Sequence, residues 1–420
     1  MSINKKLTIG LFGFGVVGEG LYKILQQTPS LNASIKRICI KNSEKERNAP
    51  KGLFTSNRKE LLDDNEIDVI VEVINESEPA FEIVQSALRN GKKVVSASKK
   101  MIAQHLPELL ELQKETRLSL LYEASACASI PLIRNLEEYY DNDLLHSLKG
   151  IVNGSTNYIL TKIFEEKLDF EQALLQAQQL GFAEANPTLD VNGWDAVHKW
   201  VILLLHAYGI VSKPDDILFT GIQNIQGSDA TAGREKNFEI RLVGHAKKLP
   251  NGKVAAFLLP QFVRPDDHLS FVKNEYNGAV IESSFADKQF FYGKGAGSFP
   301  TASAVLSDIS ALNYNYKYGY KKLYNHQPSE LSNDFYLRIY LSFDHWDFVP
   351  KDSFEWIDEW HAERNRKYLI GVIHISKLLR DNWWRENGTS LILAPEAIVD
   401  NAEITKLKLK GLELTVLNLN

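Results

Sequence analysis

The segment from Gly181 to Lys199 gathers the side chains of this chain that are best suited to acid–base chemistry. It reads GFAEANPTLDVNGWDAVHK and contains Glu184, Asp190 and Asp195 ahead of the lysine. Glycine and proline interrupt its first part, which predicts a loop followed by a helix. Because carboxylates can hold a cationic group and a lysine can exchange a proton, the segment predicts a polar reaction or binding site.

The helix that would position these groups is expected over residues 194–208, WDAVHKWVILLLHAY, and ends before Gly209. At about 100° per residue, Asp195, Lys199 and His206 share one face, while apolar side chains cover the rest. A helix that is apolar nearly all round is normally buried, so we expect Asp195 and Lys199 to line a polar cavity. The alternative is a surface ion pair worth about 0.3–0.5 kcal/mol. We interpret His206 as a core histidine with satisfied hydrogen bonds.

Length and composition predict a globular protein of roughly two or three domains. The chain has 420 residues, 44% hydrophobic and 10% aromatic, and a net charge of −5, which gives no reason to expect nucleic acid or an acidic membrane as a partner. The cysteines, Cys39 and Cys127, lack metal-ligand spacing and favour a reducing compartment. We find neither a signal peptide nor an apolar run of about 18 residues, so we expect a soluble, cytoplasmic protein.

A glycine-rich turn near the N-terminus predicts dinucleotide binding. The sequence GFGVVG follows the apolar run 7–12 and precedes a helical pattern, which is the strand, turn and helix context that this motif requires. The first glycine would form the turn, the second would let a pyrophosphate approach, and the third would permit close packing. A plain glycine-rich turn is the alternative. The predicted cofactor contacts are Gly13, Phe14, Gly15, Val16, Val17 and Gly18.

The end of the second expected strand, residues 34–40, bears on the choice of cofactor. A site for NAD usually carries an acidic residue there to hold the ribose hydroxyl groups, but this chain has Lys41, followed by Lys45 and Arg47. Lysines could hold a 2′-phosphate, so we predict NADP, with NAD left open. A solvated basic loop is the alternative interpretation.

Further expected strands at 68–74, 93–96 and 118–124, with a helix at 79–90, would complete a parallel sheet. Ligands collect beyond the carboxyl ends of strands in such sheets. Asn75 and Lys99 follow two of these ends and are site candidates, although Lys99 could equally be a surface lysine. Glu123 lies near the end of the last strand, before a run of small residues.

The second half of the chain predicts a mixed α+β region. Residue ranges 146–152 and 238–282 contain strand patterns, and a second glycine-rich loop leads into a helix at 302–312 that could pack back on the first domain. Residues 313–327, polar and rich in tyrosine, are expected to be a linker. The tail has strand patterns at 336–343 and 368–375, an expected helix at 353–363, and five tryptophans that suggest an interface, a small-ligand domain or an aromatic core. Those tryptophans are Trp346, Trp356, Trp360, Trp383 and Trp384.

The fold predicted from these patterns is α/β: a Rossmann-type NAD(P)-binding domain, an α+β substrate and dimerisation domain, and a small C-terminal α+β domain. We place the first at residues 1–140, completed by a returning helix near 300–315. The second would span 141–300. The third would span 328–420, with no role assigned.

Six stretches of the chain resemble, in order and spacing, the homoserine dehydrogenase family. They are GLFGFGVVG, VVSASKKMI, YEASACASIPLIRNL, GIVNGSTNYIL, LGFAEANPTLDVNGWDAVHKWVIL and GKGAGSFPTASAVLSDI, from residue 10 to about 310. The resemblance implies NAD(P)H-dependent reduction of aspartate 4-semialdehyde to homoserine, on the route to threonine and methionine. It also implies a homodimer or a higher homo-oligomer.

The resemblance assigns roles by position. Lys199 would be the catalytic acid or base, with Asp195 and Lys99 in the same catalytic set. Substrate contacts would come from Glu184, Asp190, Asp195 and Thr156. Further cofactor contacts would come from Asn75, Ala97, Lys99 and Gly297. A monovalent cation such as sodium would be held by Glu123 and by carbonyl groups near Ala126 and Ala128.

The chain departs from the family pattern at three places. Ser98 stands where the family commonly has asparagine, and residues 126–129 read ACAS where glycines are usual. No DxPG-type start of a regulatory domain occurs in residues 330–420, so we do not predict feedback inhibition by threonine. Two alternatives stay open: a non-catalytic NADP-binding sensor or scaffold, and a dehydrogenase acting on another amino-acid aldehyde.

Overall fold

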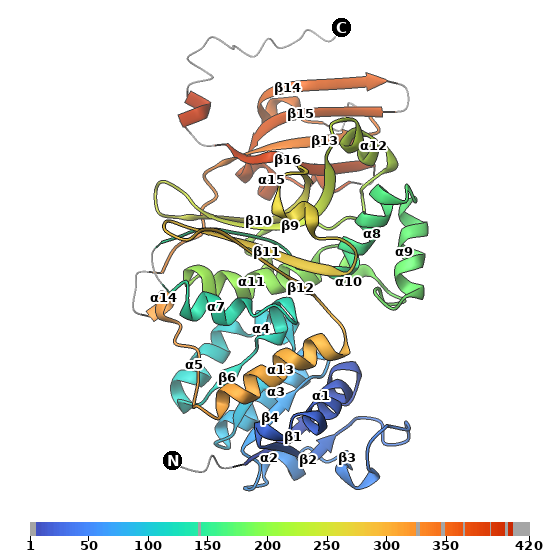
Figure 1. Cartoon of the computed structure of the whole chain (residues 1–420). Helices are drawn as coiled ribbons and strands as arrows, with labels where there is room; N and C mark the ends of the chain where they lie inside the picture. Colours follow the sequence, from blue (N-terminus) through green and yellow to red (C-terminus); the bar gives the residue numbers. More distant parts are fainter. Residues whose placement is uncertain are drawn as a thin grey trace. The chain divides into compact units, whose positions relative to one another are not determined.

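The computed structural model describes residues 6–141, 144–324, 328–345, 349–363, 366–386, 388–399 and 402–405 (Figure 1). The chain forms two compact units, and each is assembled from three stretches of sequence. Unit 1 comprises Met1–Leu145, His198–Pro214 and Phe291–Pro328; unit 2 comprises His146–Val197, Asp215–Phe290 and Ser329–Asn420. Within the described ranges, no helix is both long and apolar enough to cross a membrane.

Unit 1 is built on a parallel sheet with the strand order β3-β2-β1-β4-β5-β6. The order reverses direction between β1 and β4, and a ligand crevice is expected beyond the carboxyl ends of the strands at such a switch point. The strands are β1 (Leu7–Phe12), β2 (Ala33–Cys39), β3 (Phe54–Thr55), β4 (Val69–Glu72), β5 (Lys93–Ser96) and β6 (Leu120–Leu121). The predicted α/β class and the Rossmann-type sheet are confirmed.

Helices connect these strands, as parallel pairing requires. They are α1 (Val16–Gln27), α2 (Lys59–Leu62), α3 (Ser77–Arg89), α4 (Lys99–Gln104), α5 (Leu106–Thr116), α6 (Ala124–Cys127) and α7 (Leu132–Glu138). The stretch expected as a strand at 118–124 is a strand only at Leu120 and Leu121, which pair with β5, and helix α6 begins at Ala124.

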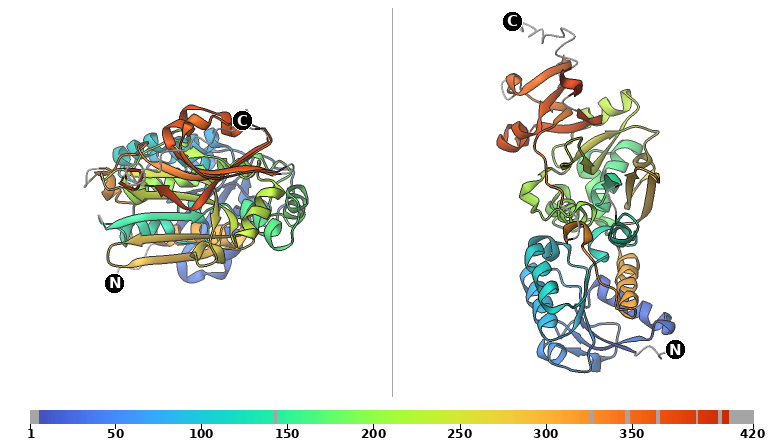
Figure 2. Two further views of the ribbon diagram at one scale, coloured as in Figure 1. Left: turned by 90° about the horizontal axis from the view of Figure 1, so that it is seen from above. Right: turned by 90° about the vertical axis from the view of Figure 1, so that its left-hand side faces the viewer.

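A later helix, α13 (Ser298–Leu312), belongs to unit 1 and packs along α1, as Figures 1 and 2 show in orange and blue. The contact is close because Gly20 has no side chain: a Cβ atom there would lie 2.5 Å from Ser298 Oγ. The Ser298 hydroxyl donates to Val16 O at 2.8 Å, so the start of α13 is fastened to the first turn of α1.

The tyrosine-rich segment expected to be a linker is part of the core of unit 1, and that prediction is wrong over its described part. Tyr318 and Tyr320 are 4% and 5% exposed. The Tyr318 hydroxyl accepts from Tyr122 N at 3.2 Å, and the hydroxyls of Tyr320 and Tyr122 lie 3.0 Å apart. Tyrosine supplies a large apolar ring with a polar tip, so a polar-looking sequence can fill a core when each hydroxyl finds a partner. Residues 325–327 of the expected linker lie outside the described ranges.

Unit 2 is built on a mixed 10-stranded sheet with the order β12-β11-β7-β9-β10-β16-β13-β15-β14, and β8 pairs with β10. The early strands are β7 (Leu145–Ile151), β8 (Leu218–Phe219), β9 (Glu239–Lys248), β10 (Val254–Val263), β11 (Tyr276–Ser283) and β12 (Asp287–Lys294). The late strands are β13 (Tyr336–Phe343), β14 (Phe354–Glu363), β15 (Arg366–His374) and β16 (Thr389–Val399). β10 is buried along its whole length, between β9 and β16.

Five helices follow or connect the early strands of unit 2. They are α8 (Gly154–Glu165), α9 (Phe170–Gln179), α10 (Thr188–Val191), α11 (Trp194–Tyr208) and α12 (Gly227–Glu235). The bounds of α11 agree with the prediction, and the helix continues past Val197 into the part of the chain that belongs to unit 1.

The prediction of a helix at 353–363 is wrong, because this stretch forms strand β14, which pairs antiparallel with β15. Its aromatic and β-branched residues, such as Trp356 and Ile357, favour a strand once a partner is present. In the tail, Trp384 is 2% exposed, packs in the core with Phe257, and donates to Leu378 O at 2.9 Å. Trp346 lies outside the described residues. In the described part of the tail, strands β13 to β16 continue the sheet of unit 2, and a separate functional role for the tail stays a prediction.

Candidate active site

The glycine-rich turn joins β1 to α1, and its three glycines answer different steric demands. Gly13 has φ +97°, and a Cβ there would lie 2.9 Å from Val73 O. A Cβ on Gly18 would lie 2.3 Å from Gly13 O. At Gly15, by contrast, no described heavy atom lies within 4 Å of the Cβ position. Gly13 and Gly18 are therefore required by the fold, while Gly15 keeps the approach to the start of α1 open.

The start of α1, just after the glycine turn, has features that suit a phosphate group. Gly15 is the N-cap residue of α1, and no side chain caps this end of the helix. The helix N-terminus offers backbone N–H groups and a positive dipole end, which suits a phosphate. Phe14 is fixed edge-on against Tyr22 and Phe54, with ring centroids 5.9 and 5.1 Å apart, and Val16 is 68% exposed. These residues fit a pyrophosphate, although their individual roles stay predictions.

Beyond β2, Lys41 stands where an acidic residue would select NAD. Its Nζ lies 2.9 Å from Glu76 Oε1, and both side chains are largely exposed. Arg47 donates to Asn42 O at 2.6 Å and lies over the Phe54 ring, 5.6 Å from its centroid. The predicted contact from Lys41 to a 2′-phosphate stays a prediction, and the ion pair adds that a phosphate there would have to displace or share Glu76.

A buried carboxylate that the sequence reading missed, Glu72, organises the carboxyl ends of β4 and β5. It is fully buried and accepts from Ile74 N at 2.7 Å, Ser96 Oγ at 2.6 Å and Ser98 Oγ at 3.0 Å. Burial raises the pKa of this carboxyl group, and the three donors oppose that shift. Its place as an acid at the end of an otherwise apolar strand is the signal that sequence analysis could have used.

The same network sets the position of Lys99, the first residue of α4. Ser98 precedes it as the N-cap residue, and its hydroxyl lies 3.0 Å from Glu72 Oε1 and 2.6 Å from Ile74 O. Serine at the position where the family has asparagine is therefore tied to β4 by hydrogen bonds. The other predicted cofactor residues are placed as follows: Asn75 is exposed after β4, Ala97 donates to Glu72 O at 3.1 Å, and Gly297, φ +117°, is the N-cap of α13.

Glu123 follows the end of β6 by two residues, as the N-cap of α6, and its buried carboxylate lies at the N-terminus of α7. Its two oxygens accept from Ile133 N at 2.9 Å and Arg134 N at 2.8 Å. Asp308 accepts from Glu123 N at 2.9 Å and pairs with Arg134 at 2.7 Å. Burial raises the pKa of Glu123 to about 8 and that of Asp308 to about 7.

The cation site predicted at Glu123, Ala126 and Ala128 stays a prediction. In the described part of the chain, no group of three or more His, Cys, Asp or Glu side chains is arranged to hold a metal ion. Ala128 has φ +45° and ψ −107°, a backbone conformation that glycine adopts more easily. The replacement of the family's glycines by alanine therefore leaves a strained residue at this position.

In unit 2, Asn153 brings Asp190 and Asp195 together. Its Nδ2 donates to Asp190 Oδ1 at 2.7 Å and to Asp195 Oδ2 at 2.8 Å. The short helix α10 carries Asp190 and α11 carries Asp195, and the turn between them depends on Gly193, which has φ +85°. The two acids thus share one hydrogen-bonding partner, while Asn153 was not singled out from the sequence. Its place as N-cap of α8, just after β7, was the available signal.

The other two predicted substrate residues, Thr156 and Glu184, lie in different surroundings from the two aspartates. Thr156 is fully buried, and its hydroxyl and N–H both donate to Asn153 Oδ1, at 2.9 and 2.8 Å. Glu184 is exposed in the loop after α9, and its carbonyl accepts from Gln178 at 3.0 Å. No described contact between side chains joins Glu184 to the Asp190–Asp195 pair. The substrate roles of both residues stay predictions.

Lys199 lies one turn after Asp195 on α11 and is only 6% exposed. Trp200, Val201 and Ile202, which follow it, are fully buried, so the predicted buried helix is confirmed and a surface ion pair does not describe this lysine. His206 is a satisfied core histidine, as predicted. Its Nδ1 lies 2.6 Å from Glu137 Oε1 and its Nε2 lies 3.0 Å from Tyr122 Oη.

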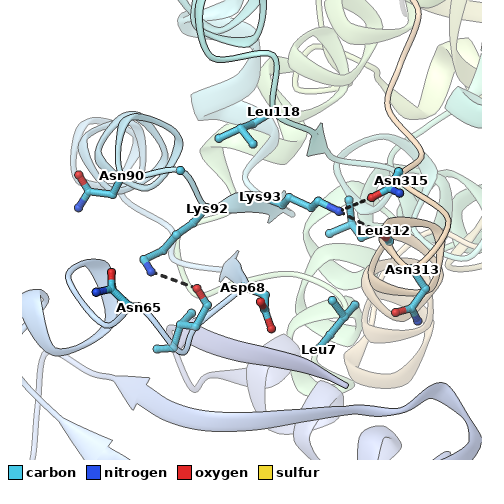
Figure 3. A pocket seen from close by; sticks show the side chains of 12 residues that line it. Leu7, Asn65, Asp68, Asn90, Lys92, Lys93, Leu118, Leu312, Asn313 and Asn315 are labelled. Carbon is cyan, nitrogen blue, oxygen red and sulfur yellow. Dashed lines mark hydrogen bonds between the residues drawn. The ribbon is translucent and has the colours of Figure 1, made fainter. Parts of the chain in front are cut away.

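A cavity of about 410 Å³ in unit 1 lies at the amino ends of β1, β4 and β5, the opposite edge of the sheet from the glycine turn (Figure 3). Its lysines are engaged by the protein itself. Lys92 Nζ donates to Asp64 O at 2.6 Å and Ile67 O at 3.0 Å, and Lys93 Nζ donates to Asn315 Oδ1 at 2.9 Å. This cavity is therefore not part of the candidate site.

Comparison with known proteins gives one consistent result. Residues 13–123 match the model of the homoserine dehydrogenase NAD-binding domain, and residues 131–310 match the homoserine dehydrogenase model. A homoserine dehydrogenase of Bacillus subtilis is 36% identical over 357 residues, 80% of this chain and 82% of its own length. A homoserine dehydrogenase structure from Thiobacillus denitrificans superimposes with a TM-score of 0.80 at 26% identity, covering 92% of this chain and 98% of that one. A hyperthermophilic archaeal homoserine dehydrogenase in complex with NADPH has a TM-score of 0.64 at 27% identity, covering 74% and 99%.

Proposed function

Because this chain belongs to the homoserine dehydrogenase family, we propose that Lys199 is the acid–base residue in NAD(P)H-dependent reduction of L-aspartate 4-semialdehyde to L-homoserine. One observation carries the proposal. Lys199 is a buried lysine one turn after Asp195, and Asn153 holds the carboxylate of Asp195 together with that of Asp190. A lysine one helical turn from a carboxylate of fixed orientation, on a largely apolar helix, suits a reaction in which charge develops on one substrate atom.

Reduction of the aldehyde leaves negative charge on its oxygen, and the residues supply what that charge needs. The Lys199 ammonium can hydrogen-bond this oxygen and give it a proton, while the reverse reaction returns the proton to the amine. The surrounding apolar side chains of α11 exclude water and strengthen the interaction. A bound nicotinamide supplies the hydride.

The substrate is an amino acid, so the site must also bind an ammonium group and a carboxylate. The carboxylates of Asp190 and Asp195, which Asn153 holds together, are proposed to accept hydrogen bonds from the substrate's ammonium group. Glu184 is proposed as a third contact from its loop. The amine of Lys99, at the carboxyl end of β5, is proposed to lie beside the nicotinamide and the substrate.

For the cofactor, we propose NADP rather than NAD. Two considerations support the choice: the presence of Lys41 in place of an acidic residue, and the NADPH bound by the archaeal relative. The open Cβ position of Gly15 leaves room for the pyrophosphate that both cofactors carry. A homodimer and a monovalent cation at Glu123 remain proposals from family resemblance.

The direct test follows reduced-nicotinamide absorbance with L-homoserine and either NADP or NAD. We expect oxidation of homoserine with the larger kcat/KM for NADP. Absence of turnover with both cofactors, in a protein that still binds NADP, would reject the proposed activity and favour the sensor or scaffold alternative. Turnover of another amino alcohol in preference to homoserine would reject the substrate assignment alone.

A further inference from the structure

The Asn153 side chain uses every hydrogen-bonding position that it has. Its amide nitrogen donates to Asp190 and Asp195, and its oxygen accepts from Thr156 N and Thr156 Oγ1. A carboxamide offers two N–H donors and two oxygen lone pairs, so no capacity is left over. Asn153 is also 3% exposed, which means that water cannot readily replace any of these partners.

The oxygen and the nitrogen of the Asn153 amide have different roles. The oxygen caps α8, a purely local task that Asn and Asp perform about equally well. The nitrogen faces two oxygens of like charge, each within 2.8 Å of the same atom. Two carboxylates that share one partner group repel each other, and the two N–H groups of the amide between them offset that repulsion. Because both N–H groups only donate, the amide holds one oxygen of each carboxylate as an acceptor.

We infer that Asn153 is a positioning residue, which sets the direction of the Asp190 and Asp195 carboxylates so that the pair receives the substrate's ammonium group. The inference rests on the proposed function, because it takes an amino-acid substrate as given. Because one oxygen of each carboxylate accepts from Asn153, this contact fixes the orientation of the whole carboxylate group. Thr156 stabilises the Asn153 side chain, because its hydroxyl donates to the amide oxygen and so fixes the rotation of the amide.

An isosteric replacement separates the two tasks. Asn153→Asp keeps an oxygen to cap α8 but turns the donating nitrogen into a third negative oxygen beside Asp190 and Asp195. Asn153→Ser also keeps a cap and retains one donor. The matched control is Asn157→Asp, one turn further along α8. Asn157 is likewise fully buried, but its nitrogen donates to the carbonyls of Val272, Asn274 and Tyr276 instead of to carboxylates.

We expect Asn153→Asp to raise the KM for L-homoserine at least about tenfold, equivalent to about 1.4 kcal/mol. The dissociation constant for NADP should stay within about twofold, and Asn153→Ser should fall between wild type and Asn153→Asp. Asn157→Asp should lower the melting temperature without a comparable change in KM. The ratio of kcat/KM for L-homoserine to that for 4-hydroxybutanoate, which lacks the ammonium, should fall in the Asn153 variants only.

Three results would overturn the inference. One is an unchanged KM in folded Asn153→Asp; another is an equal rise in KM in Asn157→Asp, which would make the effect structural. The third is an unchanged ratio between homoserine and 4-hydroxybutanoate in Asn153→Ser, the variant that serves if Asn153→Asp does not fold. Calorimetric titration of L-homoserine onto the NADPH-bound proteins gives the same comparison without turnover, because an alcohol cannot be oxidised by a cofactor that is already reduced. Failure of wild-type turnover with normal homoserine binding would therefore reject the proposed function, not the role of Asn153.

Discussion

The glycine turn allows a paired prediction in which two similar substitutions fail for different reasons. Gly18→Ala would place a methyl group 2.3 Å from Gly13 O, a backbone atom that cannot rotate away. Overpacking of this kind costs about 1–3 kcal/mol. A domain of this size loses about 2–4 °C per kcal/mol, so we expect the melting temperature to fall by about 2–12 °C.

Gly15→Ala should leave stability nearly unchanged, because no described atom lies within 4 Å of the new methyl group and the backbone, with φ −91°, suits alanine. The loss of a glycine N-cap should cost no more than about 1 kcal/mol. The methyl would instead stand where the pyrophosphate approaches. If the phosphate must retreat at the same cost of about 1–3 kcal/mol, the dissociation constant for NADPH rises about 5- to 150-fold.

The measurements are thermal unfolding without cofactor and titration of NADPH fluorescence. Gly52→Ala is the control, since its Cβ position is also free of described neighbours within 4 Å but lies outside the turn. It should change neither quantity. Wild-type NADPH affinity in Gly15→Ala would refute the assignment of this turn to the pyrophosphate. A loss of stability in Gly15→Ala equal to that in Gly18→Ala would refute the steric distinction between the two glycines.

Three further predictions concern the lysines and the buried acids. Lys199→Ala should lower kcat for homoserine oxidation at least about 10²-fold with unchanged affinity for NADP; near wild-type turnover would remove this lysine from the chemistry. Lys41→Ala should raise the KM for NADP about tenfold and leave that for NAD unchanged, so that equal effects on both cofactors would count against a phosphate contact. The melting temperature should fall as pH rises from about 6.5 to 8, because burial raises the pKa of Asp308 to about 7 and of Glu123 to about 8. Acids with raised folded pKa values stabilise fully below their unfolded values near 4 and lose that contribution as pH climbs through the folded values; a rise in melting temperature over this window would contradict the assignment.

The sequence predicted those parts of the fold whose signal is local. The glycine turn, the apolar helix α11 and strands such as β5 and β13 have the expected bounds or nearly so, because periodicity and turn residues determine them. The helix expected at 353–363 failed because pairing with β15 outweighs local preference in β14. That pairing depends on residues distant in the sequence, which no local pattern shows.

The candidate site was predictable to a similar extent. The segment carrying Asp190, Asp195 and Lys199 could be found from residue type and spacing. The sequence places Asn153 and Glu72 at the ends of strands, but it does not show their partners, which folding brings to them: two carboxylates for Asn153 and two serine hydroxyls for Glu72. A polar residue at the end of a buried strand has many possible partners, and only the tertiary structure selects among them.

The buried tyrosine-rich segment has a practical consequence for anyone who divides this chain into fragments. A boundary drawn by composition would cut near residue 313, where the sequence turns polar. Such a cut would strip Tyr318 and Tyr320 from Tyr122, and would remove the backbone N–H groups of Gly319 and Tyr320 from Glu137, the partner of His206. A cofactor-binding fragment that ends there would expose the apolar surface around Tyr122 and leave Glu137 with fewer hydrogen-bond donors. We therefore expect such a fragment to aggregate on expression. Tags, protease sites and fusion joints belong elsewhere than in residues 316–324.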